Sequence, residues 1–289
     1  YYAVTAWSGE FTGAVLEYGA WPEQRSRMFT LAQASPTIQD SFPNAGLEGC
    51  IYGALEALTD SLLTREWQRE DGAELKIERL LIDANWGAST DVVYQFCRQC
   101  RWGGIVCPAH GRYVGASSKP MTEYRRQAGD RMGFNWMMPS VAGKRAIRHV
   151  IFDSNFWKSF VHSRLAVPLG DRGCLSLWGR RPDIHQQMAD HLTAEYRVRT
   201  AGRGRIVDEW KLRPDRSDNH WLDCLAGCAV CGSMLGATMP EFGTAAPLKR
   251  RSAPIKLSEI AAAKRADDST PVHGGRPRIR LSELQNRKK

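Results

Sequence analysis

A continuous apolar run ends in an acid and a turn at residues 80–87, which read LLIDANWG. Unbroken apolar residues are typical of a strand that is buried on both faces of a parallel sheet. A helical pattern follows over residues 90–101, with Val92 and Phe96 on one side, and a second short apolar strand follows over residues 104–107. A strand, a helix and a strand in this order usually produce parallel pairing. The stretch therefore predicts an α/β fold.

The rest of the sequence also alternates strands with helices. Residues 2–18 read as a strand hairpin, and residues 49–67 read as an amphipathic helix. Residues 108–144 show little periodicity, so we expect an irregular and functional loop there. Further strands are predicted at residues 149–152, 174–178, 197–200 and 205–210, and further helices at residues 155–165, 184–196 and 218–235. The pattern indicates one α/β domain over residues 1–239.

The composition excludes a membrane-spanning protein and a chain without a core. The chain has 289 residues, of which 43% are hydrophobic, and this is enough to bury a core. No apolar stretch approaches the roughly 18 residues of a membrane span. After Pro240 the sequence becomes rich in Lys, Arg, Pro, Ser and Gly, which predicts a basic flexible tail over residues 240–289. The sequence opens at Tyr1 with a strand-like pattern and no signal peptide, so we expect it to begin within a longer protein.

Positive charge is concentrated in two segments. Residues 98–148 carry 10 Lys and Arg against 2 Asp and Glu, and residues 248–289 carry 12 against 4. Such concentration is typical of contact with a phosphate backbone, and a solvated basic surface is the alternative. The candidate DNA contacts are Arg98, Arg101, Arg112, Lys119, Arg125, Arg126, Lys144 and Arg145. Aromatic residues that could stack on bases lie among them: Trp102, Tyr113, Tyr124 and Trp136.

Two acids are candidates for catalysis. Asp83 ends a predicted strand, where open α/β sheets bind their ligands, although it would equally suit a turn or a cap for the next helix. Asp223 lies within NHWLDC, residues 219–224, on a helix that is otherwise apolar. An unpaired charge is costly there, although an acid in the first turns of a helix also favours the helix dipole. Two such carboxylates suit Mg²⁺ or Mn²⁺ and hydrolysis of a phosphodiester.

Six segments together resemble a known family: LID at 81–83, VVYQFCR at 92–98, residues 153–165, LTAE at 192–195, DEW at 208–210 and NHWLDC at 219–224. They look like the nuclease domain of the terminase large subunit of tailed bacteriophages, in its lambda-type form. The resemblance covers roughly residues 1–238, and NHWLDC is its most specific part. It implies an RNase H-like fold and a two-metal endonuclease that cuts concatemeric phage DNA during packaging in the host cytoplasm.

The resemblance also implies roles for individual residues and partners. Asp83 matches the middle acid of the family, and Asp223 matches its late helix acid. The first acid of the family lies on a strand before Tyr1, so we expect this chain to lack it. Apart from the resemblance, Asp153 and Asp218 are candidate reserve metal ligands, and Asn219 and His220 are accessory candidates, although His220 would equally suit a capping or packing role. The implied partners are double-stranded DNA, the small terminase subunit and the portal, and the implied cofactors are two Mg²⁺ or Mn²⁺ ions.

Other chemistry is less well supported by the sequence. No G-x-x-x-x-G-K-[ST] motif is present, so we expect no ATPase activity in this chain. Cys97, Cys100, Cys107 and His110 have the spacing of a zinc site, but we expect core cysteines there and no zinc. Eight cysteines in a chain with a sizeable core suit a reducing compartment. The competing functions are a non-catalytic nucleic-acid-binding protein that retains the RNase H-like fold and a zinc-stabilised interaction module.

Overall fold

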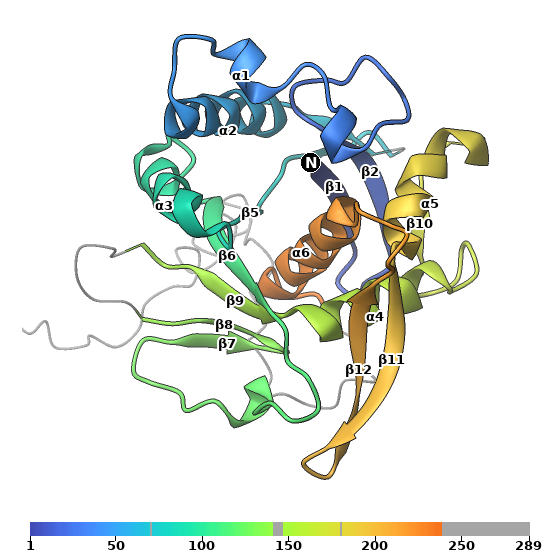
Figure 1. Ribbon diagram of the computed structural model, residues 1–289. Coiled ribbons are helices and arrows are strands. Elements are labelled where there is room, and N and C mark those ends of the chain that lie inside the picture. The colour runs from blue at the N-terminus through green and yellow to red at the C-terminus, as the bar shows by residue number, and fades with distance from the viewer. Residues whose placement is uncertain (70, 141–146, 180, 239–289) are drawn as a thin grey trace, which may run out of the picture. The chain divides into compact units, whose positions relative to one another are not determined.

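Two larger β-sheets with helices around them form the part of the chain that the computed structural model describes, which is residues 1–69, 71–140, 147–179 and 181–238 (Figure 1). The three-stranded sheet has the order β1 (Tyr2–Trp7), β2 (Gly13–Gly19) and β10 (Leu175–Leu177). The five-stranded sheet has the order β5 (Leu80–Asp83), β6 (Val106–Arg112), β9 (Val150–Asp153), β8 (Trp136–Met138) and β7 (Arg131–Gly133). In it β5, β6 and β9 are parallel, whereas β8 and β7 are antiparallel. The fold is mixed α/β, as the sequence predicts.

Helices and two short ribbons complete the described chain. The helices are α1 (Ile38–Ser41), α2 (Leu47–Leu63), α3 (Thr90–Gln99), α4 (Ser154–Leu165), α5 (Gln186–Thr193) and α6 (His220–Met234). The ribbons are β3 (Trp67–Gln68) with β4 (Glu74–Leu75), and β11 (Glu195–Gly202) with β12 (Arg205–Leu212). None of the helices that the structure describes is long and apolar enough to cross a membrane.

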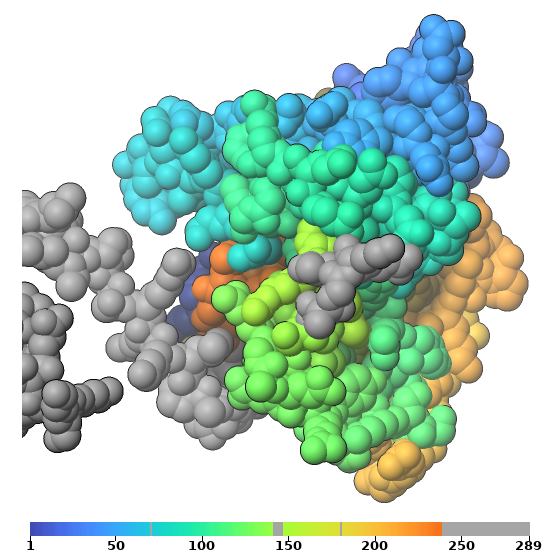
Figure 2. All heavy atoms as spheres, turned by 90° about the vertical axis from the view of Figure 1, so that its left-hand side faces the viewer, coloured from blue at the N-terminus to red at the C-terminus, as the bar shows by residue number. Residues whose placement is uncertain are grey.

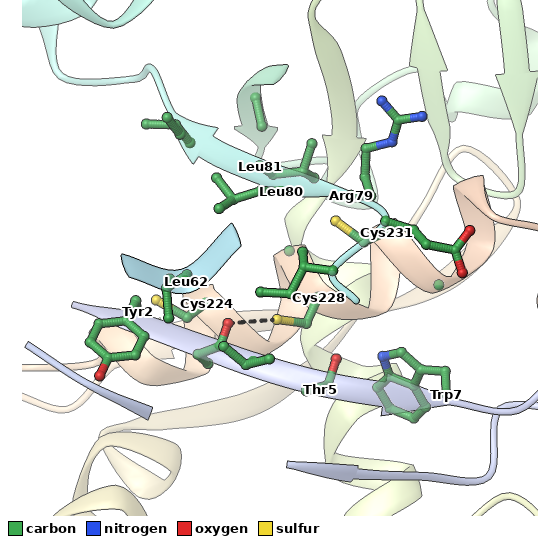
Figure 3. Close-up of a pocket in the computed structure, with 18 of the residues that line it drawn as sticks. Tyr2, Thr5, Trp7, Leu62, Arg79, Leu80, Leu81, Cys224, Cys228 and Cys231 are labelled. Atoms are coloured by element: carbon green, nitrogen blue, oxygen red, sulfur yellow. Dashed lines mark hydrogen bonds between the residues drawn. The ribbon is translucent and has the colours of Figure 1, made fainter. Parts of the chain in front are cut away.

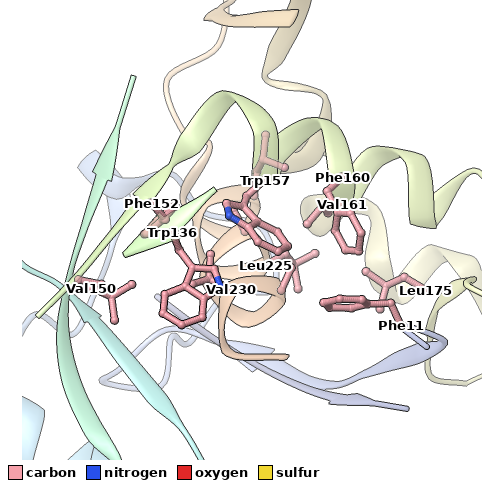
Figure 4. Packing of buried hydrophobic residues seen from close by; sticks show 14 of the residues in the cluster. Phe11, Trp136, Val150, Phe152, Trp157, Phe160, Val161, Leu175, Leu225 and Val230 are labelled. Atoms are coloured by element: carbon pink, nitrogen blue, oxygen red, sulfur yellow. The ribbon is translucent and has the colours of Figure 1, made fainter. Parts of the chain in front are cut away.

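The main core lies between α4, α6 and strands of both sheets. Trp157 and Phe160 of α4 pack with Leu225 and Val230 of α6, and Phe11 reaches them from the turn after β1 (Figure 4). All five side chains are at most 3% exposed. Burying a side chain of this size stabilises the fold by roughly 1.5–3 kcal/mol. Helix α6 packs against α4, α5, β1 and β5. It therefore needs apolar residues on most of its surface, which explains why its sequence is apolar on nearly all sides.

The parallel unit that the sequence predicts around residues 80–107 is confirmed. Strands β5 and β6 pair in parallel, with Asp83 opposite Ala109, and α3 connects them. The hairpin at the start of the chain is confirmed too, since β1 and β2 pair antiparallel. Phe11 lies outside both strands, in a turn with a left-handed backbone conformation.

Two predictions about the sheets are wrong. Residues 108–144 are not one irregular loop, because β6 continues to Arg112 and β7 and β8 add to the sheet. These added strands have three residues each, too few to produce a periodic pattern. Leu80, Leu81 and Ile82 of β5 are only partly buried, because β5 lies at the edge of its sheet.

Candidate active site

Asp83 lies at the end of β5, in the turn that leads to α3. Its Oδ1 accepts a hydrogen bond from the backbone N–H of Asn85 at 3.1 Å, and the residue is exposed. The start of α3 is held by another residue, since Oγ1 of Thr90 donates to the carbonyl of Ala84 at 2.8 Å. Asp83 therefore shapes the turn without capping the helix, and its carboxylate remains open to solvent.

A short chain of polar side chains fixes the segment that follows Asp83. The hydroxyl of Tyr94 lies 2.8 Å from Nε2 of His110, and Nδ1 of His110 lies 2.9 Å from Oδ1 of Asn85. Nδ2 of Asn85 donates to the carbonyl of Gly111 at 3.0 Å. Burial lowers the pKa of His110, and the charge of Asp83 opposes that change. His110 thus holds the Asp83 turn against β6.

Lys158 of α4 joins two acids from different elements. Its Nζ lies 2.8 Å from Oδ1 of Asp223, in the first turn of α6, and 2.5 Å from Oε1 of Glu195, at the start of β11. Nδ2 of Asn219 donates a hydrogen bond to the same oxygen of Glu195. Lys158 and Glu195 are buried. Asp223 is therefore not a lone charge on an apolar helix, because a buried ammonium group accompanies it.

The charges in this cluster depend on one another. Desolvation favours the neutral amine of Lys158, but the carboxylates of Asp223 and Glu195 outweigh it and raise the pKa of Lys158. The pKa of Asp223 is raised as well, first by desolvation, which the ammonium of Lys158 opposes, and then by the negative charges of Glu195 and Asp83. Asp223 is still 53% exposed, because its carboxylate faces open space. Lys158 is thus the group that favours an ionised Asp223.

Asp83 and Asp223 line one cavity of about 830 Å³ that extends between β1, β5 and α6. Lys158, Asn85 and His220 line it too, and part of its wall appears in Figure 3. The negative charge of Asp83 is also among the causes that raise the pKa of Asp223. Carboxylate oxygens facing a shared cavity are a donor set that fits a divalent cation. The structure thus places the two acids that the sequence singles out on the wall of one cavity.

Asp153, a reserve ligand in the sequence analysis, lies outside this cavity and caps α4. Its Oδ1 accepts a hydrogen bond from the backbone N–H of Phe156 at 3.1 Å. Desolvation raises the pKa of Asp153 to about 6, although the N–H groups of Phe156 and Asn155 favour the charged form. The residue is 8% exposed. This acid is better suited to holding a helix end than to binding a metal.

Replacing Asp153 by Asn is expected to change stability in a pH-dependent way. Between about pH 4 and pH 6 the folded protein keeps a proton on Asp153 that the unfolded chain releases, so this group makes the fold less stable as the pH rises. Asn caps helices as well as Asp does. We expect Asp153→Asn to raise the free energy of unfolding by about 1–3 kcal/mol at pH 7 and to leave it unchanged at pH 3.5. Urea unfolding at both pH values measures this, and a lower midpoint at pH 7 would show that the helix needs the charge.

Asp218, the other reserve ligand, also lies outside the cavity. Its Oδ2 accepts a hydrogen bond from the backbone N–H of Leu31 at 2.8 Å. His220 stacks on Tyr1 with ring centroids 4.4 Å apart, and its Nε2 lies 3.8 Å from Asp218. Burial lowers the pKa of His220. Asp218 and His220 therefore attach the N-terminal segments to the start of α6, and of the two only His220 reaches the cavity.

The candidate DNA contacts that the structure describes are all exposed: Arg98, Arg101, Arg112, Lys119, Arg125 and Arg126. Arg101 forms an ion pair with Asp60 at 3.0 Å. Tyr113 is 54% exposed, but Trp136 is buried and donates a hydrogen bond to Ser233. The prediction that Trp136 stacks on bases is therefore wrong, because β8 packs into the core. Lys144, Arg145 and the predicted tail at 240–289 lie outside the described residues.

The residues with zinc-like spacing lie in different surroundings. Cys97 packs in a cluster on α3, Cys107 packs in the main core, and His110 is engaged with Tyr94. All eight cysteines are free thiols. Across the described ranges, no three His, Cys, Asp or Glu side chains gather as ligands for a metal.

Sequence reasoning missed Lys158 and Glu195 as parts of the site. A signal for Lys158 is present, because it lies within FWKSF, residues 156–160, where Trp157 and Phe160 face the core. A lysine among buried aromatic residues needs an acidic partner. Glu195 lies in one of the six family segments, but its sequence context does not reveal which residue it contacts.

Comparison with known proteins identifies one family. The profile of the family described as terminase large subunit gpA, endonuclease domain, matches residues 52–241, which is more than half of the chain. No curated protein and no solved structure matches the chain. The matched range includes Asp83, Lys158, Glu195 and Asp223. The chain belongs to the terminase large subunit gpA endonuclease domain family.

Proposed function

We propose that this chain is the nuclease part of a phage terminase and cuts concatemeric DNA during genome packaging. The family supports this class of reaction. The observation that carries the proposal is that Asp83 and Asp223, from a strand end and from a distant helix, face one cavity. The mixed sheet, with parallel strands β5, β6 and β9 and flanking helices, supports an RNase H-like arrangement of these acids.

Asp83 and Asp223 would hold Mg²⁺ or Mn²⁺ through their carboxylate oxygens. When bound, such cations activate water and stabilise the leaving 3′ oxygen of a phosphodiester. Lys158 favours the ionised form of Asp223 and fixes its position through the 2.8 Å ion pair. His110 and Asn85 fix the turn that carries Asp83. The contribution of the protein is thus to hold the carboxylates of Asp83 and Asp223 in position before the substrate binds.

The exposed arginine and lysine side chains between residues 98 and 126 support binding to double-stranded DNA. The basic segment at 248–289 adds positive charge in the sequence. Contacts of this kind with phosphates provide affinity without reading the base sequence. As part of a packaging terminase, the chain would work beside the small terminase subunit and the portal in the host cytoplasm.

A non-catalytic DNA-binding protein is the second candidate, and the ion pair between Lys158 and Asp223 favours it. The ammonium group of Lys158 supplies positive charge at 2.8 Å from Asp223. The negative charge of Asp223 is therefore balanced by a residue of the same chain, without a metal cation. A protein that retains the fold and its basic surface would then bind DNA without hydrolysing it.

Calorimetric titration with Mn²⁺ tests the proposal on the whole chain. Removing even an outer-shell partner of a metal typically lowers its affinity about 10- to 100-fold. We therefore expect wild type to bind Mn²⁺, and we expect Asp223→Asn, which removes a proposed ligand, to weaken that binding by at least about 10-fold. The matched control is Asp190→Asn, which removes the same charge from α5, where Asp190 pairs with Arg216 at 3.0 Å. Unchanged Mn²⁺ binding in Asp223→Asn would contradict the assignment. Absence of Mn²⁺ binding by wild type would favour the second candidate.

A further inference from the structure

Trp86 is the most exposed tryptophan of the chain, and it lies close to Asp83 in the sequence. Its side chain is 61% exposed. Trp178, the next most exposed, packs against the rings of Tyr18 and His185. Tryptophan is highly buried on average in folded proteins, so an indole this open to solvent beside a candidate catalytic acid is unusual. Trp86 is therefore a candidate for contact with a ligand.

Hydrogen bonds hold the backbone on both sides of Trp86. Before it, Nδ2 of Asn85 donates to the carbonyl of Gly111 at 3.0 Å. After it, the backbone N–H of Ser89 donates to the carbonyl of Trp86 at 2.7 Å. An indole on a fixed backbone has only two side-chain torsions to lose when a ligand covers it, so little conformational entropy opposes binding. The turn thus presents Trp86 in a preorganised position.

Arg112 lies at the same edge of the five-stranded sheet. Strands β5 and β6 are parallel, so Asp83 and Arg112 end their strands at one edge. The hydrogen bond between Asn85 and Gly111 joins the two residues that come just before Trp86 and before this arginine. Arg112 is exposed and has no acidic partner among the described residues. A ring and a cation thus follow neighbouring strands at the edge that carries Asp83.

The cavity lined by Asp83 and Asp223 opens to solvent. Figure 2 shows α6, in orange, in a hollow between the cyan and green segments. Asn85 and Gly111 line this cavity as well. Its rim therefore includes the residues that directly precede the exposed indole and the exposed guanidinium group. A polymer that places a phosphodiester at Asp83 would pass these two side chains at the rim.

DNA presents groups that fit such a pair of side chains. A guanidinium group binds phosphate oxygens, and an indole stacks on the flat face of a base. In a paired duplex the neighbouring bases already cover both faces of an internal base. An exposed ring therefore reaches a base face only where the DNA is unpaired or locally opened.

We propose that Trp86 stacks on an unpaired base beside the phosphodiester that faces Asp83, while Arg112 binds a neighbouring phosphate. The substrate class is then duplex DNA that is opened over a few base pairs where the protein binds. The inference rests on the proposed nuclease function for the position of that phosphodiester. The stacking itself requires no metal, so it can be measured apart from cleavage.

A protein partner fits this surface less well. The centre of a stable protein interface is mainly apolar and is depleted of charged residues. The residues near Trp86 in sequence and across the sheet edge, Asp83, Asn85 and Arg112, are instead polar or charged and exposed. A single indole among such residues is better suited to a base that lies between phosphates.

Fluorescence of 2-aminopurine in DNA tests the stacking in EDTA, where metal-dependent cleavage does not occur. Two duplexes of one sequence carry this base analogue, one fully paired and one with a central bubble of mismatched pairs. Stacking on an aromatic side chain contributes roughly 5- to 140-fold to affinity per base. We expect wild type to bind the bubble at least about 5-fold more tightly than the paired duplex. It should also quench the 2-aminopurine of the bubble, because the indole stacks on it.

Three variants keep this test decisive. Trp86→Ala should lose both the preference for the bubble and the quenching, and it should fold normally because the side chain is exposed. Trp86→Phe should retain most of the preference, since a phenyl ring also stacks on a base. Trp178→Ala is the matched control, because it removes another exposed indole that does not line the cavity. It should bind both duplexes as wild type does.

The possible failures have different meanings. Equal affinity of wild type for the bubble and the paired duplex would overturn the stacking and leave the proposed metal site unaffected, since Mn²⁺ binding tests that site separately. A preference for the bubble that survives in Trp86→Ala would also overturn the stacking and would favour a protein contact for the indole. Failure to bind either duplex would overturn this inference together with the DNA-binding part of the proposed function.

Discussion

Asp83→Asn is expected to lower the rate of Mn²⁺-dependent nicking of supercoiled plasmid by at least about 100-fold. Removing even an outer-shell partner of a metal commonly lowers metal affinity or activity about 10- to 100-fold, and Asp83 is proposed as a direct ligand. In the proposed site the charge of the carboxylate holds the cation, and we expect the fold not to need it. The side-chain carbonyl of Asn can still accept the hydrogen bond from the N–H of Asn85. DNA affinity, measured by fluorescence anisotropy without metal, should stay at the wild-type value.

Asp71→Asn is the matched control for this loss. Asp71 is an exposed acid between β3 and β4 that pairs with Arg69, and it does not line the cavity. Its replacement removes the same charge and should leave nicking unchanged. If Asp83→Asn cuts at the wild-type rate, Asp83 serves only the turn after β5, and the proposed active site is wrong.

Lys158→Met is expected to destabilise the fold by about 3–5 kcal/mol, the usual effect of removing one partner from a buried ion pair. Met retains most of the apolar stem but leaves Glu195 buried without its cation. For a domain of this size the midpoint of thermal unfolding should fall by about 6–20 °C. Calorimetry in EDTA measures the effect apart from any metal binding.

An exposed pair and a double variant show whether burial is the cause. Lys76 lies 2.7 Å from Glu66, and both are largely exposed, so Lys76→Met should change stability by at most about 1 kcal/mol. Glu195→Gln in the Lys158→Met background should recover part of the loss, because it removes the uncompensated charge. Equal effects of Lys158→Met and Lys76→Met would show that the buried cluster contributes no more than a surface pair.

Local patterns in the sequence predict much of the fold, and they also predict the two acids. The run at residues 80–83 and the helix after it predict the parallel pairing of β5 and β6. The position of Asp83 at a strand end and of Asp223 on an apolar helix depends only on neighbouring residues. Such features are encoded within a short window, so they can be read without knowing tertiary contacts.

The features that could not be predicted depend on partners far apart in the sequence. Lys158, Glu195 and Asp223 come from three elements, and their contacts follow from the packing of α4 against α6. The partial burial of β5 has a similar origin, because apolar residues alone do not reveal that a strand lies at a sheet edge. Asp153 looks like a ligand in the sequence, and only its hydrogen bond to Phe156 shows that it caps a helix.

The thiols on α6 have a consequence for the oxidation chemistry of the protein. Burial raises the pKa of Cys224 to about 12 and that of Cys228 to about 11, and it raises the pKa of Cys231 well above its ordinary value. The thiolate is the nucleophile in disulfide exchange and in reaction with peroxide. At neutral pH the thiolate fraction of Cys228 is on the order of 1 in 10,000. These cysteines lie on one stripe of α6, but they are therefore slow to form disulfides or sulfenic acids. The part of the cavity wall that they form thus keeps its apolar character under mild oxidation.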